Sequence, residues 1–189
     1  MSTLFHRNIE QHRSVLDTMQ ALEPSVQTAA EAIAERLRRG HKLMLCGNGG
    51  SAADCQHIAA EMTGRFIKDR RPLAAIALST DSSALTCISN DYAFEEVFAR
   101  QLEGIGRPGD CLLAISTSGQ SANVYRAVQT ARAGGIYTIG LLGRDGGIVG
   151  ATCDCAIVVS SEVTARVQEM HILIGHTLCG LVESALGLA

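Results

Sequence analysis

Short hydrophobic runs alternate with longer amphipathic stretches along most of this chain of 189 residues. The runs predict five strands, at about residues 42–46, 72–78, 111–115, 136–142 and 156–159. Because nearly every position in these runs is apolar, we expect strands buried on both faces, which is typical of a parallel sheet. Strands that alternate with helices also need crossover connections. We therefore expect an α/β fold, a three-layer αβα sandwich with a five-stranded, mainly parallel sheet.

The amphipathic stretches predict helices before and between these strands. They lie at about residues 4–22, 24–39, 52–62, 83–88, 93–103, 122–133 and 164–186. The first two precede every strand and form an N-terminal helical hairpin, residues 1–40, which we expect to be part of an oligomer interface. Residues 41–189 contain all the predicted strands. We see no linker between these parts, so we expect a single structural domain overall.

A glycine-rich turn, Cys46-Gly47-Asn48-Gly49-Gly50-Ser51, joins the first predicted strand to a helix. The first N–H groups of a helix lack partners and carry partial positive charge. Glycines let the backbone approach an oxyanion closely, because they have no Cβ. Ser51 is expected to cap the helix and to donate to the anion. The turn therefore predicts an anion-binding site.

A second apolar run leads into Ser116-Thr117-Ser118-Gly119-Gln120-Ser121, which carries four hydroxyl groups. Neither turn has the Gly-x-Gly-x-x-Gly spacing or the Gly-Lys-Ser/Thr ending of nucleotide sites. In an open parallel sheet, ligands bind at the carboxyl ends of the strands, where both turns should lie. We expect a site for a phosphorylated small molecule, with an ordinary Ser/Thr loop as the alternative for the second turn.

Two predicted helices carry groups that are able to move protons. His57 and Glu61 are four residues apart and project from one helix face. Gln168 and His176 are about two turns apart on the last helix. This set suits acid–base catalysis and also a divalent metal. The alternatives are a surface pair for His57 and Glu61, and ordinary polar positions for the histidines of the last helix.

Three further polar residues are candidates for substrate binding. Asn90 and Asp91 are expected in a loop, where Asp91 either accepts sugar hydroxyls or, by default, caps a helix before Ala93. Arg65 either neutralises phosphate or lies at a solvated helix end.

The composition narrows the function classes. Hydrophobic residues make up 47% and charged residues 19%, as in a globular protein with a sizeable core. The formal net charge of −3 gives no electrostatic basis for binding nucleic acid or a membrane surface. We find no apolar run long enough to span a membrane and no signal-peptide core, so we expect a cytoplasmic protein.

The seven cysteines are expected to be reduced and structural. Cys46, Cys87, Cys111 and Cys179 lie in apolar runs, where a free thiol behaves as a small hydrophobic group. The Cys153-Asp154-Cys155 spacing is too tight for a usual zinc pair.

Several motifs, in order, resemble the sugar isomerase (SIS) domain family and, within it, the phosphoheptose isomerases. They are Gly47 to Asp54 with Gln56-His57, then Thr80-Asp81, Ser89 to Tyr92, Ser116 to Ser121, and Gln168-Glu169 with His171 and His176. The resemblance covers nearly the whole chain. It implies the SIS fold and an isomerase that converts sedoheptulose 7-phosphate to D-glycero-D-manno-heptose 7-phosphate. The product would feed ADP/GDP-heptose synthesis for lipopolysaccharide or other bacterial glycans.

The same resemblance implies residue roles. Glu61 and His176 would be the catalytic acid–base pair, and one zinc ion per subunit would be held by His57, Glu61, Gln168 and His176. Phosphate would be held by Ser51, Ser116, Thr117, Ser118 and Ser121. The rest of the substrate site would contain Asn48, Gly49, Gly50, Glu61, Arg65, Asn90, Asp91 and Gln168. The resemblance also implies a homotetramer with active sites between subunits.

Other functions stay open at this point. Val163 and Ala165 stand in a loop where many relatives carry an Asp, which leaves the contacts to the distal hydroxyls open. The family also includes a non-catalytic protein that associates with the replication initiator, sugar-phosphate-sensing regulators, and isomerases of other phosphosugars. Because Glu61 and His176 are both present, we expect an enzyme.

Overall fold

The computed structural model describes residues 3–189, which contain one five-stranded sheet. Its strands are β1 (Leu43–Gly47), β2 (Ala75–Ala77), β3 (Cys111–Ser116), β4 (Tyr137–Gly143) and β5 (Cys155–Val159). They are ordered β2-β1-β3-β4-β5, and every neighbouring pair is parallel. From β1 the chain first moves outward to β2, and it then returns past β1 to β3, from where β4 and β5 follow in the opposite direction. This switch point is where ligands bind in open sheets.

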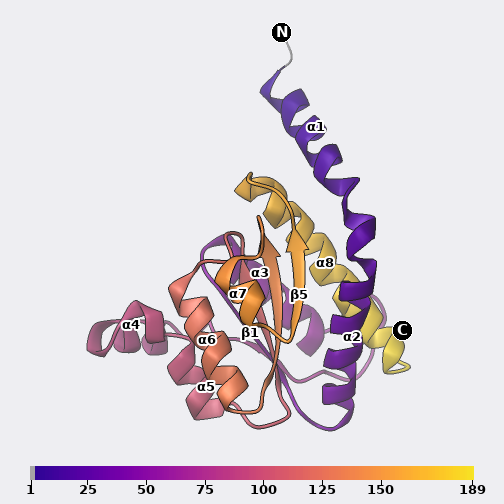
Figure 1. The fold of residues 1–189 in the computed structure, drawn as a ribbon. Helices are drawn as coiled ribbons and strands as arrows, with labels where there is room; N and C mark the ends of the chain where they lie inside the picture. The colour runs from indigo at the N-terminus through magenta and orange to yellow at the C-terminus, as the bar shows by residue number, and fades with distance from the viewer. Residues whose placement is uncertain (1–2) are drawn as a thin grey trace.

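Helices surround the sheet. They are α1 (Leu4–Leu16), α2 (Glu23–Arg38), α3 (Gly50–Thr63), α4 (Ser82–Asp91), α5 (Ala99–Ile105), α6 (Ala122–Ala133), α7 (Gly147–Thr152) and α8 (Thr164–Ala185), with 3₁₀ turns η1 (Met19–Leu22) and η2 (Phe94–Glu96). Pro24 lies in the first turn of α2, where its missing N–H does no harm. In Figure 1, α2 lies beside α8, whereas α1 extends away from the body.

The strands send side chains alternately to two hydrophobic cores. In β1, Leu43 and Leu45 belong to the core under α2, α3 and α8, whereas Met44 and Cys46 belong to the core under α5, α6 and α7. Such alternation follows from the period of two in a strand. The predicted three-layer αβα sandwich with a parallel sheet is therefore confirmed.

Two predicted segments on the β2 side have different lengths in the structure. The predicted strand 72–78 pairs with β1 only at 75–77, because it is the edge strand and one face of it is open, with Ile76 39% exposed. The helix predicted at 83–88 continues to Asp91. Asn90 and Asp91 therefore end a helix and do not lie in a loop, and the prediction of a cap before Ala93 is wrong.

Other boundaries also differ. The predicted helix 4–22 is divided into α1 and η1, and the predicted helix 93–103 into η2 and α5. Cys46, Cys111 and Cys179 are buried, as expected for small hydrophobic groups, whereas Cys87 is exposed and does not fit that expectation. Apolar neighbours in the sequence do not show whether other elements pack over a given face of a helix.

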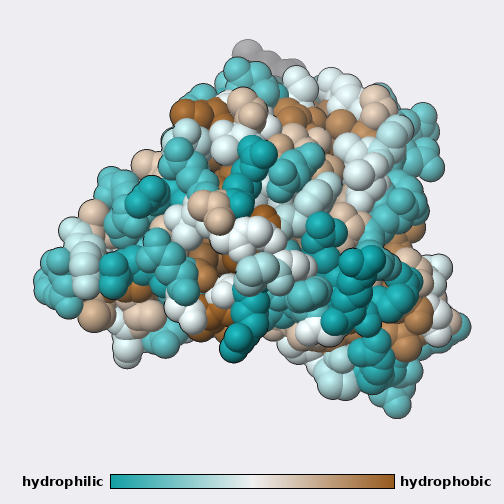
Figure 2. Space-filling model, turned by 60° about the horizontal axis from the view of Figure 1, so that its bottom comes forward, coloured by the Kyte–Doolittle hydropathy of each residue, from teal (hydrophilic) through white to brown (hydrophobic). Residues whose placement is uncertain are grey.

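The surface is mainly polar on the side shown in Figure 2, where hydrophobic residues form separate patches between hydrophilic ones. Among residues 3–189, none of the helices combines the length and apolar character required to cross a bilayer.

Candidate active site

The glycine-rich turn leaves β1 at the switch point and starts α3. Gly49, with φ +57°, precedes the helix, and Ser51 N–H donates to the Asn48 carbonyl at 3.0 Å. The helix begins at Gly50, so Ser51 lies inside it and makes no capping hydrogen bond. The prediction that Ser51 caps this helix is therefore wrong. Ser51 is only 3% exposed. It lies against Gly47: a Cβ added to Gly47 would be 2.9 Å from the Cβ of Ser51.

The hydroxyl-rich turn joins β3 to α6 and gathers its serines. Ser116 Oγ accepts from the Gly119 N–H at 3.1 Å and lies 3.0 Å from Ser121 Oγ and 3.4 Å from Ser118 Oγ. Thr117 lies in the same turn, and Ser121 directly precedes α6. Clustered hydroxyls at a helix N-terminus form a suitable cradle for an oxyanion.

A pair of asparagines joins the two turns. Asn48 Nδ2 donates to Asn123 Oδ1 at 2.8 Å, and Asn123 Nδ2 donates back to Asn48 Oδ1 at 2.9 Å. Asn123 is 3% exposed and also accepts from the Val124 N–H. The sequence analysis missed Asn123. In the sequence, Asn123 is a polar residue near the start of a predicted helix. That position does not tell whether the side chain is buried and joins two turns or is exposed to solvent.

A carboxylate and two imidazoles meet where α3 lies against α8. His57 Nε2 is 3.3 Å from Glu61 Oε1 and 3.4 Å from His176 Nε2. The two rings meet edge to face, with centroids 4.9 Å apart. The helices approach closely because Gly175 has no Cβ: one built there would lie 2.7 Å from Ile58 Cδ1. The structure thus brings together the predicted residues His57, Glu61 and His176.

Gln168, on α8, packs against the first residue of α3. A Cβ on Gly50 would lie 2.1 Å from Gln168 Nε2, so the amide rests directly on the bare backbone. Asp54, on the same helix, has one buried carboxylate oxygen without a partner among the described residues. Burial raises the pKa of Asp54, and the nearby His57 opposes this in part.

The donor set fits a metal ion such as zinc. The ligating atoms of His57, Glu61 and His176 all lie within 4.8 Å of one another. Two atoms bound at about 2.0–2.1 Å to a tetrahedral ion are separated by roughly 3.3 Å. The measured separations from His57 Nε2 to Glu61 and to His176, 3.3 and 3.4 Å, match that spacing.

Three predicted site residues are not brought to these groups within the described chain. Asn90 donates to Asp91 at 2.8 Å, and Cys87 Sγ approaches the same carboxylate, at the exposed end of α4. Figure 1 shows α4 projecting from the body of the molecule. Arg65 is also exposed, and it donates to the Ile67 carbonyl of its own loop.

Comparison with known proteins gives a consistent assignment. The SIS domain family model matches residues 8–143. A phosphoheptose isomerase of Nitratiruptor sp. is 55% identical over 177 residues, covering 94% of this chain and 95% of the relative.

Two solved structures agree. A phosphoheptose isomerase from Neisseria gonorrhoeae has a TM-score of 0.86 at 46% identity, covering 96% of this chain and 100% of that one. Another, from Francisella tularensis, has a TM-score of 0.92 at 35% identity, covering 97% and 100%. These matches confirm the predicted resemblance, and the chain belongs to the SIS domain family.

Proposed function

We propose that this chain is a phosphoheptose isomerase that converts sedoheptulose 7-phosphate to D-glycero-D-manno-heptose 7-phosphate. The observation that carries the proposal is the position of Glu61 beside two imidazoles, on a helix that starts at the glycine-rich turn. Relatives named phosphoheptose isomerase, at 46–55% identity over most of the chain, support this substrate and reaction.

The reaction needs one base for a carbon-bound proton and one group for the oxygens. Glu61 takes a proton from C1 of the ketose, which leaves an enediol, and returns it to C2. His176 moves the hydroxyl proton from O1 to O2, so that the ketone becomes an alcohol and C1 becomes the aldehyde. No atom is gained or lost in this exchange. Each such group typically contributes about 10²–10⁴-fold to the rate.

The substrate would extend from the two turns toward this pair. The phosphate would lie among the hydroxyls of Ser51, Ser116, Thr117, Ser118 and Ser121. At about 1.5 Å per residue, His57 lies roughly 9 Å along α3 from Ser51. This is comparable to the length of a seven-carbon sugar phosphate. Asn48, Gly49, Gly50 and Gln168 would line the path between the two ends.

We also propose that His57, Glu61, Gln168 and His176 hold one zinc ion. When bound, the ion would polarise the substrate carbonyl. The spacing of the donor atoms of His57, Glu61 and His176 supports three of these ligands.

The assembly that we propose is a homotetramer with active sites between subunits. Asn90, Asp91 and Arg65 are exposed in one chain, and a neighbouring chain would bring them to a site. The N-terminal helices, residues 1–40, would form part of the interface. The expected cytoplasmic location stays a prediction.

The direct test is to incubate the purified protein with sedoheptulose 7-phosphate and to follow the aldose by NMR. Glu61→Gln should reduce turnover at least 10²-fold, because the proposed base is lost, while phosphosugar binding stays nearly unchanged, because the phosphate-binding turns are untouched. Glu103→Gln, the same change at an exposed position of α5, is the matched control. Binding of the phosphosugar without turnover, with or without added zinc, would favour a non-catalytic sugar-phosphate sensor instead.

Elemental analysis of protein purified without chelator tests the metal. We expect about one zinc per chain, and a strong loss in His57→Ala and in His176→Ala, because each removes one ligand. His6→Ala, on exposed α1, should keep its metal content. Equal zinc content in all these proteins would refute the site.

A further inference from the structure

Arg70 lies in the loop between α3 and β2, yet its side chain is only 2% exposed. Its guanidinium donates to four backbone carbonyls: Glu61 at 2.7 Å, Met62 at 2.8 Å, Gly64 at 2.9 Å and Arg71 at 3.0 Å. The first two belong to the last turn of α3 and the third to its C-cap, where carbonyls lack helical partners and carry partial negative charge. Arg70 therefore fixes the helix turn that carries Glu61.

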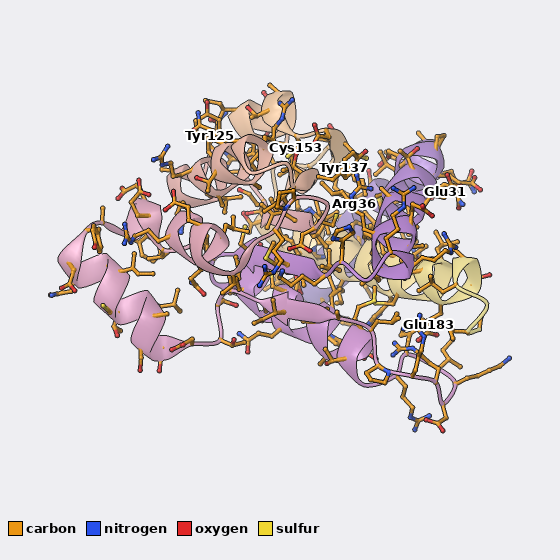
Figure 3. All side chains as sticks on the ribbon, turned by 90° about the horizontal axis from the view of Figure 1, so that it is seen from below. Glu31, Arg36, Tyr125, Tyr137, Cys153 and Glu183 are labelled. Carbon is orange, nitrogen blue, oxygen red and sulfur yellow. The ribbon has the colours of Figure 1, made fainter. Side chains whose placement is uncertain are left out.

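Glu183 on α8 completes this arrangement. Its Oε1 accepts from Arg70 Nε at 2.7 Å and from the Phe66 N–H at 3.2 Å, and its side chain is 3% exposed. Figure 3 shows Glu183 next to the loop that follows α3. Removing one partner of a buried pair leaves an uncompensated charge, so the two residues act as a unit. The pair joins the end of α3, the loop and α8.

The same loop places an aromatic ring on the proposed catalytic histidine. Phe66 stacks on His176, with centroids 5.5 Å apart and planes 27° from parallel. A Cβ on Gly180 would lie 3.5 Å from Phe66 Cε1, so the ring also rests on the bare backbone of α8. With His57 edge-on at 4.9 Å, the His176 ring is held between two neighbours.

We propose that Arg70 and Glu183 are positioning residues: they hold the end of α3 and, through Phe66, the ring of His176. The catalytic consequence rests on the proposed roles of Glu61 and His176. Residues that orient a reacting or ligating group typically change activity or metal affinity 10–100-fold when they are substituted.

Arg70→Lys is the first test. Lysine keeps the charge but lacks the planar fork that reaches several carbonyls and Glu183 together. We expect kcat to fall 10–100-fold while KM changes less than about twofold, because the phosphate-binding turns are untouched. Arg71→Lys is the matched control, since the neighbouring side chain is exposed. It should keep wild-type kinetics.

A second readout does not depend on turnover. Protons above an aromatic face resonate upfield, so Phe66→Leu should move the His176 ring signals downfield in NMR spectra. Arg70→Lys and Glu183→Gln should move them in the same direction if both residues act through Phe66. This readout decides the positioning role even if the wild-type protein fails to convert the heptose phosphate.

Two outcomes would overturn the inference. One is a lower melting temperature for Arg70→Lys with unchanged His176 signals and unchanged kcat, which would mark Arg70 as a stabilising residue only. The other outcome is a wild-type kcat for Phe66→Leu. This variant keeps the hydrogen bond from the backbone N–H of residue 66 to Glu183, so it tests the inference even if the Arg70 variant does not fold.

Discussion

The two histidines of α8, His171 and His176, lie in different environments. His171 follows Gln168 on α8 by about one turn, but its side chain is fully buried, and neither ring nitrogen has a hydrogen-bond partner among the described residues. Burial lowers the pKa of His171 from 6.5 to about 4, and the nearby Leu142 backbone opposes this only in part. The folded protein therefore holds a neutral imidazole in its core.

This residue predicts a pH dependence of stability. Between pH 6.5 and about 4 the unfolded chain binds a proton at His171 that the folded chain does not bind. The free energy of unfolding should therefore fall as the pH drops through this window, by about 3 kcal/mol at most. In His171→Leu that contribution to the decline should be absent. Urea unfolding at several pH values measures it, with exposed His6→Leu as the control. Parallel curves for wild type and His171→Leu would contradict the prediction.

The contact between α3 and α8 depends on positions without a side chain. Ile58 packs against the backbone of Gly175, and the amide of Gln168 packs against the backbone of Gly50. Both contacts bring groups from distant parts of the sequence within reach of one substrate. The two helices therefore form the site as a pair.

Gly50→Ala tests this pairing. The new Cβ would meet only the end of a flexible side chain, Gln168 Nε2, so the stability cost should be below about 1 kcal/mol. The amide must move, however, and we expect about a 10-fold loss of zinc or phosphosugar affinity. Calorimetric titration with zinc and with the phosphosugar measures this loss of affinity. In a Gln168→Ala background the same change should have little further effect, because interacting residues are not additive. Full additivity would show that Gly50 acts independently of Gln168.

Among the helices and strands, the sequence predicted the bounds of the central elements best. The buried strands β1, β3, β4 and β5 and the helix α6 appear close to their predicted ranges, because nearly continuous burial leaves a clear apolar pattern. The edge strand β2 and helix α4 were misjudged, since their ends depend on neighbours that the local pattern does not reveal.

The site was predicted only in part. Spacing placed His57 and Glu61 on one helix face and pointed to Gln168 and His176 on the last helix, whereas the specific roles came from the resemblance. Asn123, Phe66 and the Arg70–Glu183 pair were missed, because their partners lie far away in the sequence. Long-range pairs of this kind need the three-dimensional arrangement.

For the whole molecule, the projecting helix α4 suggests a site shared between chains. At its exposed end, the Asp91 carboxylate accepts from the Asn90 amide and from the Cys87 thiol. If Asn90 and Asp91 bind the sugar, as we propose, they do so in a neighbouring subunit. Each chain would then contribute to two sites.

Mixed oligomers test this arrangement. Glu61→Gln and Asp91→Asn should each be nearly inactive alone. Co-expressed with different tags and purified as hybrids, they should recover roughly a quarter of wild-type activity, since random mixing leaves about one shared site in four intact. Glu61→Gln mixed with His176→Ala should recover none, because those side chains meet within one chain. Equal behaviour of the two mixtures would exclude a shared site.

Helix α8 also has a consequence for how the chain folds. It packs against α2 from the other end of the sequence and against α3, and it carries His176 and Glu183. Contacts between such distant segments close large loops, and their entropic cost delays them. Docking of α8 is therefore expected late in folding, after the sheet has formed. On refolding, recovery of activity should lag behind recovery of secondary structure, because the proposed catalytic pair, Glu61 and His176, comes together only in that last step.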